Sequence, residues 1–288
     1  MAYHYSVQIS RSIKSFEQIP MRTFLYSSLI FCLCYLTGCT NRREISGIKD
    51  DPCLRFECES GAVIRADTNK KNLAVVFTGN EFADGGEHIL SVLKKQQIPG
   101  SFFFTGNFYR NPGFEQLIRS LLSNGHYLGA HSDKHLLYCD WNNRDSLLVT
   151  KEEFIHDLKN NYKVMRMFGI SKKNALFFLP SYEWYNDTIS NWTKSLGLQL
   201  INYTPGTLSH ADYTTPDMPN YKSSEFIYKS ILEFESGSME GLNGFILLTH
   251  IGTAPERKDK FYYYLDTLIT ELKRRGYQFE RIDELLDQ

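Results

Sequence analysis

Short, continuous apolar runs alternate with amphipathic segments along most of the chain. The runs LAVVFTG (73–79), SFFFTG (101–106) and GFILLTH (244–250) show no alternation of apolar and polar residues, so they indicate strands buried on both faces. Between the first two runs, residues 87–98 place apolar side chains three and four positions apart, which is typical of a helix. Strands that alternate with helices predict a parallel sheet with right-handed crossovers.

The N-terminal region has the pattern of an export signal. From Met21 it reads MRTFLYSSLIFCLCYLTGC, with a basic start and an apolar run that is too short to span a bilayer. Its last four residues, LTGC, resemble the lipobox of bacterial lipoproteins, in which the peptide is cut before a cysteine that then carries lipid. We therefore predict that residues 1–39 are a leader, with Met21 as an alternative true start. Cys39 would anchor an exported bacterial lipoprotein at the cell envelope, facing the periplasm or the cell surface.

The rest of the chain divides into a linker and one domain. Residues 40–70 are polar and irregular, which predicts a flexible tether to a single domain over residues 71–288. The length of that domain suits one α/β barrel, which takes about 250 residues. Cys53 and Cys58 could form a small disulfide loop in an exported protein. The formal net charge is −1 without a long run of one sign, so the sequence gives no indication of nucleic-acid binding.

Polar residues suited to catalysis follow the predicted strands directly. Glu81, His131, Glu183 and His250 each lie at the carboxyl end of a predicted strand. In a parallel barrel these ends meet on one face, and that face carries the chemistry. His131 and His135 lie four residues apart, so both imidazoles can reach one cation. The sequence therefore predicts a single site with a metal-binding pair of histidines.

The order of these motifs resembles the polysaccharide deacetylases of carbohydrate esterase family 4. The stretch NGHYLGAHSDKH is similar to that family's H-[ST]-x-x-H motif, FFLPSYEWYN to its R-P-P-Y-G motif, and GFILLTH to its L-x-H motif. The closing stretch LITELKRRGYQFERIDELL is similar to the family's last helix and strand. The resemblance covers about residues 73–285 and implies a distorted, incomplete (β/α) barrel, TIM-like, of about seven parallel strands.

The resemblance also implies a metal-dependent hydrolase that removes N- or O-acetyl groups from an acetylated oligo- or polysaccharide. The bond cleaved would be a C–N bond other than a peptide bond, or a carboxylic ester. One divalent metal is implied, zinc in first place with cobalt, nickel and manganese as alternatives, held by His131, His135 and a first-motif carboxylate, Glu81 ahead of Asp84. The other implied roles are proton donation to the leaving group by His250, oxyanion stabilisation by the backbone N–H of Tyr182, and substrate contacts by Pro180, Tyr182, Trp184 and Asp212.

Two positions depart from the family pattern together. Asn80 stands where the first motif, T-F-D-D-G, has its catalytic base, and Leu179 stands where the third motif has the arginine that orients this base. The paired change is coherent, because an arginine without the aspartate would be an unpaired buried charge. We expect Asp84 to replace the base, ahead of Glu183. The alternative is a glycan-binding lipoprotein with a deacetylase fold that has lost catalysis, and the presence of His250 favours the enzyme.

Overall fold

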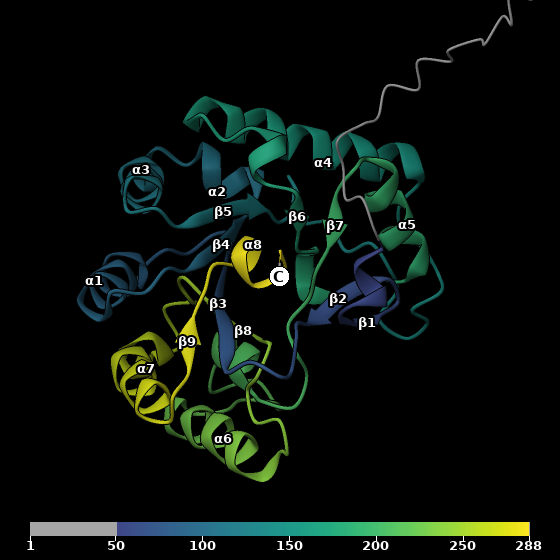
Figure 1. Cartoon of the computed structure of the whole chain (residues 1–288). Coiled ribbons are helices and arrows are strands. Elements are labelled where there is room, and N and C mark those ends of the chain that lie inside the picture. The colour runs from purple at the N-terminus through teal and green to yellow at the C-terminus, as the bar shows by residue number, and fades with distance from the viewer. Residues whose placement is uncertain (1–50, 288) are drawn as a thin grey trace, which may run out of the picture. The chain divides into compact units, whose positions relative to one another are not determined.

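A computed structural model describes residues 51–287 (Figure 1). Residues 1–50, which include the predicted leader and Cys39, lie outside the described residues. Within residues 51–287 no helix combines the length and the apolar character needed to cross a membrane. The strands are β1 (Glu57–Glu59), β2 (Ala62–Arg65), β3 (Asn72–Gly79), β4 (Ser101–Phe104), β5 (Tyr127–Ala130), β6 (Phe177–Phe178), β7 (Gln199–Leu200), β8 (Phe245–His250) and β9 (Gln278–Phe279). The helices are α1 (Gly86–Gln96), α2 (Gly106–Arg110), α3 (Glu115–Ser123), α4 (Lys151–Met165), α5 (Asp187–Ser195), α6 (Ser224–Gly237), α7 (Leu265–Arg274) and α8 (Ile282–Leu285).

The nine strands of this range form one sheet in the order β1-β2-β8-β3-β4-β5-β6-β7, and β9 pairs with the first residues of β3. Strands β3 to β9 pair in parallel, which confirms the predicted fold class, whereas β2 joins β8 in antiparallel orientation. Val63 in β2 also pairs with Ile201, just after β7, so β2 links the two ends of the parallel sheet. The sheet therefore curls into a barrel, and Figure 1 shows helices α1, α3, α4, α6 and α7 around it.

The central strands explain why their sequences read as continuous apolar runs. Every residue of β3 after Asn72 is buried, and β4 and β5 are buried throughout. Phe77 of β3 stacks on Phe102 of β4 with ring centroids 4.8 Å apart. Because helices cover the outside of the sheet and side chains fill its inside, neither face of these strands meets water.

The prediction of a flexible tether over residues 40–70 is wrong for residues 51–70. These residues form a 3₁₀ turn and the hairpin of β1 and β2, and all four residues of β2 are buried. Cys53 and Cys58 form the disulfide that the sequence allowed. The sequence of this region looks like a linker because its strands are short and its turns are polar. The hairpin forms because β2 fills the gap between β8 and the end of β7, which is a tertiary effect.

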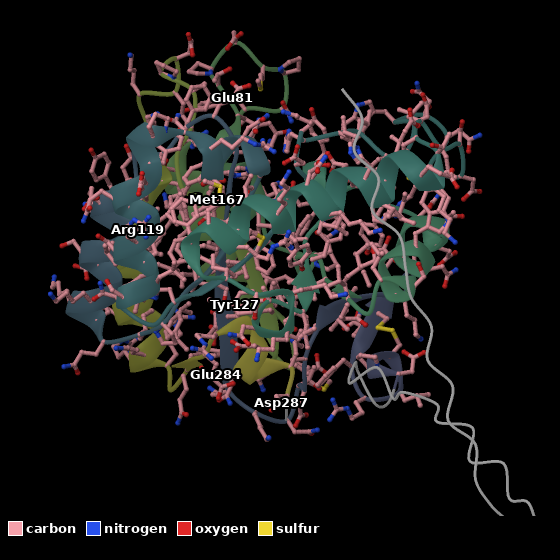
Figure 2. The ribbon with its side chains drawn as sticks, turned by 90° about the horizontal axis from the view of Figure 1, so that it is seen from above. Glu81, Arg119, Tyr127, Met167, Glu284 and Asp287 are labelled. Carbon is pink, nitrogen blue, oxygen red and sulfur yellow. A yellow bond between two sulfur atoms is a disulfide. The ribbon has the colours of Figure 1, made fainter. Side chains whose placement is uncertain are left out.

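The predicted site residues lie at one end of the domain. Figure 2 shows Glu81 at this end, and Glu284 and Asp287 at the opposite end. Glu81 follows the carboxyl end of β3, whereas Glu284 belongs to α8, which follows β9. The arrangement places the functional loops where a parallel barrel carries its chemistry.

Candidate active site

A pocket of about 550 Å³ opens at the carboxyl ends of β3, β5 and β8. Loops that follow β5, β6 and β8 form its walls together with residues near the end of the 3₁₀ turn Ser209–Tyr213. A pocket of this volume is large enough for a small ligand such as a sugar residue. Six residues predicted from the sequence line it: Glu81, His131, His135, Tyr182, Glu183 and His250.

Hydrogen bonds fix the orientation of His131, which directly follows β5. Its Nδ1 lies 2.9 Å from the carbonyl oxygen of Leu179, so Nδ1 carries the proton and Nε2 keeps its lone pair. Its backbone N–H donates to Oδ1 of Asn161 in α4, at 2.9 Å. Burial lowers the pKa of His131 well below its usual value, so the imidazole is neutral. A neutral imidazole with a fixed tautomer is suited to bind a metal ion.

The loop that carries His135 is held by Asp157 of α4, a residue that sequence analysis missed. The buried Asp157 carboxylate accepts hydrogen bonds from the Ser132 hydroxyl at 2.8 Å and from the backbone N–H groups of Asp133 and Lys134, each at 2.9 Å. These hydrogen bonds fix the backbone just before His135. The ring centroid of His135 lies 5.3 Å from that of His131. Burial lowers the pKa of His135 to about 4, so this imidazole is also neutral at ordinary pH.

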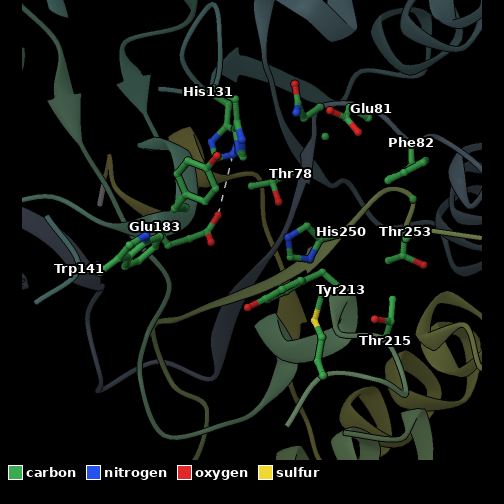
Figure 3. A pocket seen from close by; sticks show the side chains of 17 residues that line it. Thr78, Glu81, Phe82, His131, Trp141, Glu183, Tyr213, Thr215, His250 and Thr253 are labelled. Atoms are coloured by element: carbon green, nitrogen blue, oxygen red, sulfur yellow. Dashed lines mark ion pairs between the residues drawn. The ribbon is translucent and has the colours of Figure 1, made fainter. Parts of the chain in front are cut away.

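Glu183 places a carboxylate beside the histidine pair. Its Oε1 lies 3.9 Å from Nε2 of His131, and Figure 3 shows Glu183 between His131 and Trp141, with Glu81 on the other side of the pocket. Burial raises the pKa of Glu183 to about 7. Asn202 fixes the backbone here, because its side-chain amide donates to the carbonyl oxygen of Glu183 at 3.0 Å.

Strained backbone is concentrated around the pocket. Glu183 has φ +53° and the preceding Tyr182 has φ +60°, both in the left-handed region that favours glycine. The family motif carries glycine at the position of Glu183. Ser132 and His135, with φ +72° and +56°, adopt the same region in the loop after β5. Backbone strain of this kind persists where the surroundings enforce it, and it is common at functional sites.

His250 and Asp212 form a second hydrogen-bonded unit in the pocket wall. Nδ1 of His250 lies 2.6 Å from Oδ1 of Asp212, and the backbone N–H of His250 donates to Oδ2 at 2.9 Å. Burial by itself lowers the pKa of His250, but the negative charge and hydrogen bond of Asp212 outweigh burial and raise it above its usual value. With Nδ1 bonded to Asp212, the other nitrogen of His250 is the one available for proton donation.

Asp84, the predicted replacement base, does not line the pocket. Its carboxylate pairs with the ammonium of Lys260 at 2.9 Å and accepts hydrogen bonds from the backbone N–H of Thr253 at 2.8 Å and from the hydroxyl of Tyr262 at 3.0 Å. These contacts connect the loop after β3 to the loop after β8. The structure thus shows Asp84 in a structural network beside the site.

Three of the predicted substrate contacts also lie outside the pocket lining. Pro180 is buried, and the carboxylate of Asp212 is hydrogen-bonded to His250. Trp184 is half-buried, with its indole N–H donating to the carbonyl oxygen of Asp140 at 3.2 Å. The fourth, Tyr182, does line the pocket. The lining residues that sequence analysis missed include Trp141 and Met218, which lie in loops without a recognisable motif.

The donor atoms at the pocket fit a divalent metal in their chemistry. Two neutral imidazoles and a carboxylate are a ligand set that suits zinc or cobalt. Within residues 51–287 no three side chains of the histidine, cysteine, aspartate and glutamate types are already gathered at metal-binding distances. Glu81, the predicted carboxylate ligand, lines the pocket but is exposed on its far side.

The chain is similar to known proteins in sequence and in fold. A family model described as polysaccharide deacetylase matches residues 65–201. The peptidoglycan-N-acetylmuramic acid deacetylase PdaA of Bacillus subtilis is 27% identical over 222 residues, which are 76% of this chain and 73% of that protein. The solved structure of PdaA, a family 4 carbohydrate esterase, has a TM-score of 0.61 at 25% identity and covers 78% of this chain and 85% of that chain.

Two more distant solved structures share the fold. A carbohydrate esterase family 4 pseudoenzyme from Bacillus anthracis has a TM-score of 0.60 at 18% identity, covering 80% of this chain and 70% of that chain. A family 4 acetyl xylan esterase from Clostridium thermocellum, in complex with a cobalt ion, has a TM-score of 0.58 at 21% identity, covering 75% of this chain and 90% of that chain. The same fold therefore occurs in an enzyme and in a protein described as a pseudoenzyme.

Proposed function

The chain belongs to the polysaccharide deacetylase family, and we propose that it removes acetyl groups from a carbohydrate with the help of one divalent metal, zinc in first place. The observation that carries the proposal is the convergence of His131, His135, Glu183 and His250 in one pocket, with His250 held by the buried Asp212. A metal-binding pair, a carboxylate and a proton donor are the groups that hydrolysis of an acetyl amide or ester requires.

Each group has a distinct role in the proposed reaction. His131 and His135 would hold the metal, which when bound polarises the acetyl carbonyl and lowers the pKa of a water molecule. The backbone N–H of Tyr182 donates to the acetyl oxygen as negative charge develops on it. His250 protonates the departing amine or alcohol, and Asp212 stabilises the imidazolium form that this step needs.

We assign the role of general base to Glu183. A base must lie within one hydrogen bond of the water whose proton it takes, and the Glu183 carboxylate is the one placed beside the histidine pair. Asp84 is bound to Lys260 and does not line the pocket, so the order predicted from the sequence is reversed in this proposal. Asn80, at the family's base position, bears an amide that does not accept a proton at neutral pH. Its Oδ1 accepts a hydrogen bond from the Thr105 hydroxyl at 3.0 Å.

The substrate proposed is an acetylated glycan of the cell envelope. PdaA, whose name specifies N-acetylmuramic acid in peptidoglycan, is the basis for this substrate class. We propose that Cys39 carries lipid and holds the enzyme at the membrane, as the LTGC pattern predicts. The disulfide between Cys53 and Cys58 supports an oxidising compartment outside the cytoplasm. The mass of the mature N-terminus tests the lipid: an unmodified N-terminus would contradict it.

The test combines metal content with acetate release from acetylated glycans. The parent is expected to bind one divalent metal per chain and to release acetate, and Glu183→Gln is expected to lower turnover on the order of a hundredfold or more with its metal retained. Glu256→Gln is the control, since Glu256 is an exposed carboxylate outside the pocket lining.

Three results would change the assignment. Loss of metal in Glu183→Gln would make Glu183 a ligand, and full activity in that variant would remove it from the mechanism. A parent that binds glycan but releases no acetate from any acetylated glycan would establish the alternative, a glycan-binding lipoprotein.

A further inference from the structure

Trp141 is a large apolar side chain that lies exposed at the edge of the pocket. Its side chain is 55% exposed, although it also belongs to the pocket lining. Its ring lies 5.7 Å from that of Tyr182 in an edge-to-face arrangement and 5.6 Å from that of Trp184. Figure 3 shows Trp141 and Glu183 on the same side of the pocket, and both belong to its lining.

The turn that carries Trp141 is rigidly built. Asp140 accepts hydrogen bonds at one carboxylate oxygen from the backbone N–H groups of Asn142 at 2.8 Å and Asn143 at 3.0 Å. Its carbonyl oxygen accepts the indole N–H of Trp184, and its N–H donates to the carbonyl oxygen of Ser146 at 2.9 Å. The backbone at Trp141 is therefore held before any ligand arrives, and the ring contacts those of Tyr182 and Trp184.

Arg144 fixes the base of this turn to the rest of the domain. Its guanidinium pairs with Glu59 of β1 at 2.6 Å and donates to the carbonyl oxygen of Tyr185. It also lies over the ring of Trp184, 4.5 Å from the centroid. Trp184 thus packs between Arg144 and Trp141, while the Trp141 ring remains partly exposed to solvent. Because its neighbours already restrict it, the Trp141 ring loses little conformational entropy when a ligand stacks on it.

Two further exposed aromatic rings line the pocket, those of Tyr182 and Tyr213, and the lining within residues 51–287 contains no lysine or arginine. Tyr213 is 42% exposed and its ring lies 5.4 Å from that of His250. Aromatic rings without basic groups suit a neutral ligand with apolar faces, such as a sugar ring, and do not suit a phosphorylated or strongly acidic one. Trp141 and Tyr213 therefore offer contacts for sugar rings beside the catalytic groups.

We propose that Trp141 forms a sugar-binding subsite next to the catalytic pocket, so that the substrate is an oligomeric glycan whose neighbouring ring stacks on the indole. This inference rests on the proposed function for the nature of the ligand. It adds that the protein selects for chain length, because a single sugar in the pocket leaves the Trp141 face uncovered.

Calorimetric binding to chelator-treated protein tests the subsite without turnover. The probes are the tetrasaccharide of N-acetylglucosamine and the single sugar N-acetylglucosamine, which are acetylated and carry no charge. The parent is expected to prefer the tetrasaccharide. Trp141→Ala is expected to weaken tetrasaccharide binding about tenfold and to remove the preference, whereas Trp141→Phe retains part of it. Tyr263→Ala is the matched control, because Tyr263 is 62% exposed and lies outside the pocket lining.

The outcomes separate this inference from the proposed function. The subsite is overturned if the Trp141→Ala variant binds both probes with the affinity of the parent, or if its affinity for both probes falls by the same factor. It is also overturned if the parent does not bind the tetrasaccharide. Loss of the length preference in a protein that never releases acetate would support the subsite and refute the enzyme. If the parent releases acetate and the Trp141→Ala substitution does not change glycan binding, the proposed enzymatic function is supported and the subsite is refuted.

Discussion

Glu183 allows a direct test of the idea that the site stores backbone strain. At φ +53° a residue with a Cβ atom costs roughly 1–2 kcal/mol relative to glycine, while glycine loses roughly 0.5–1 kcal/mol more backbone entropy on folding. Glu183→Gly and Glu183→Ala both remove the buried carboxylate, so their difference isolates the backbone. We expect the glycine variant to be more stable than the alanine variant by about 1 kcal/mol. Both variants should lose acetate release, because both lack the proposed base.

The assay is urea unfolding of both variants in the presence of a chelator, so that metal binding does not contribute to the free energy of unfolding. A difference of about 1 kcal/mol appears as a shift in midpoint at unchanged slope, and as roughly 2–4 °C in Tm for a domain of this size. Glu233, exposed in the middle of α6, is the control position. There the glycine variant should be the less stable one by about 1 kcal/mol. If alanine is at least as stable as glycine at position 183, the strain argument is wrong.

Two further predictions concern titrating groups. Asp212→Asn should lower the pKa of His250, because it removes the negative charge that stabilises the imidazolium. The alkaline decline of turnover should then move to lower pH, and turnover at neutral pH should fall tenfold or more. An unchanged pH–rate profile would contradict this role of Asp212. Burial lowers the pKa of His126 to about 4, while an unfolded histidine titrates near 6.5. The free energy of unfolding should therefore fall by at most about 3 kcal/mol as the pH drops from 6.5 to 4. His126→Asn keeps an acceptor for the N–H of Gly100 and should reduce this acid dependence in urea unfolding at pH 7 and pH 4.5; equal dependence in both proteins would refute the assignment.

The barrel could be predicted because its signals are local. A strand buried on both faces must be apolar throughout, and β3, β4 and β8 have this pattern in the sequence. The hairpin of β1 and β2 could not be predicted, since β1 has three residues and its partner depends on the gap between β8 and Ile201. Short strands that complete a sheet derive their stability from the sheet and carry little pattern of their own.

The site was predictable to the level of its loops, but the role of each side chain was not. Placement at strand ends located His131 and His250 correctly at one pocket. Asp84 and Glu183 were both plausible bases in the sequence, and what separates them is distant in the chain: Asp84 is bound to Lys260, 176 residues later, while Glu183 lies opposite His131. Trp141 has no motif at all, and only the fold shows that its loop borders the pocket. Side-chain partners of this kind are decided by tertiary packing.

Residues of the pocket that lower the stability of the fold help to distinguish an enzyme from a glycan-binding protein. The Bacillus anthracis pseudoenzyme has the same fold, so the fold alone does not imply activity. Glu183 combines a buried carboxylate with a left-handed backbone conformation, and both lower the stability of the fold. In a protein that did not need this carboxylate, a stabilising substitution at position 183 would be easy to find. Asp212 is a second buried carboxylate, and its hydrogen bonds go to His250. Binding a neutral sugar requires neither carboxylate, because exposed rings such as Trp141 supply the contact area. The presence of both carboxylates beside the histidines therefore favours proton transfer, and with it catalysis, over binding alone.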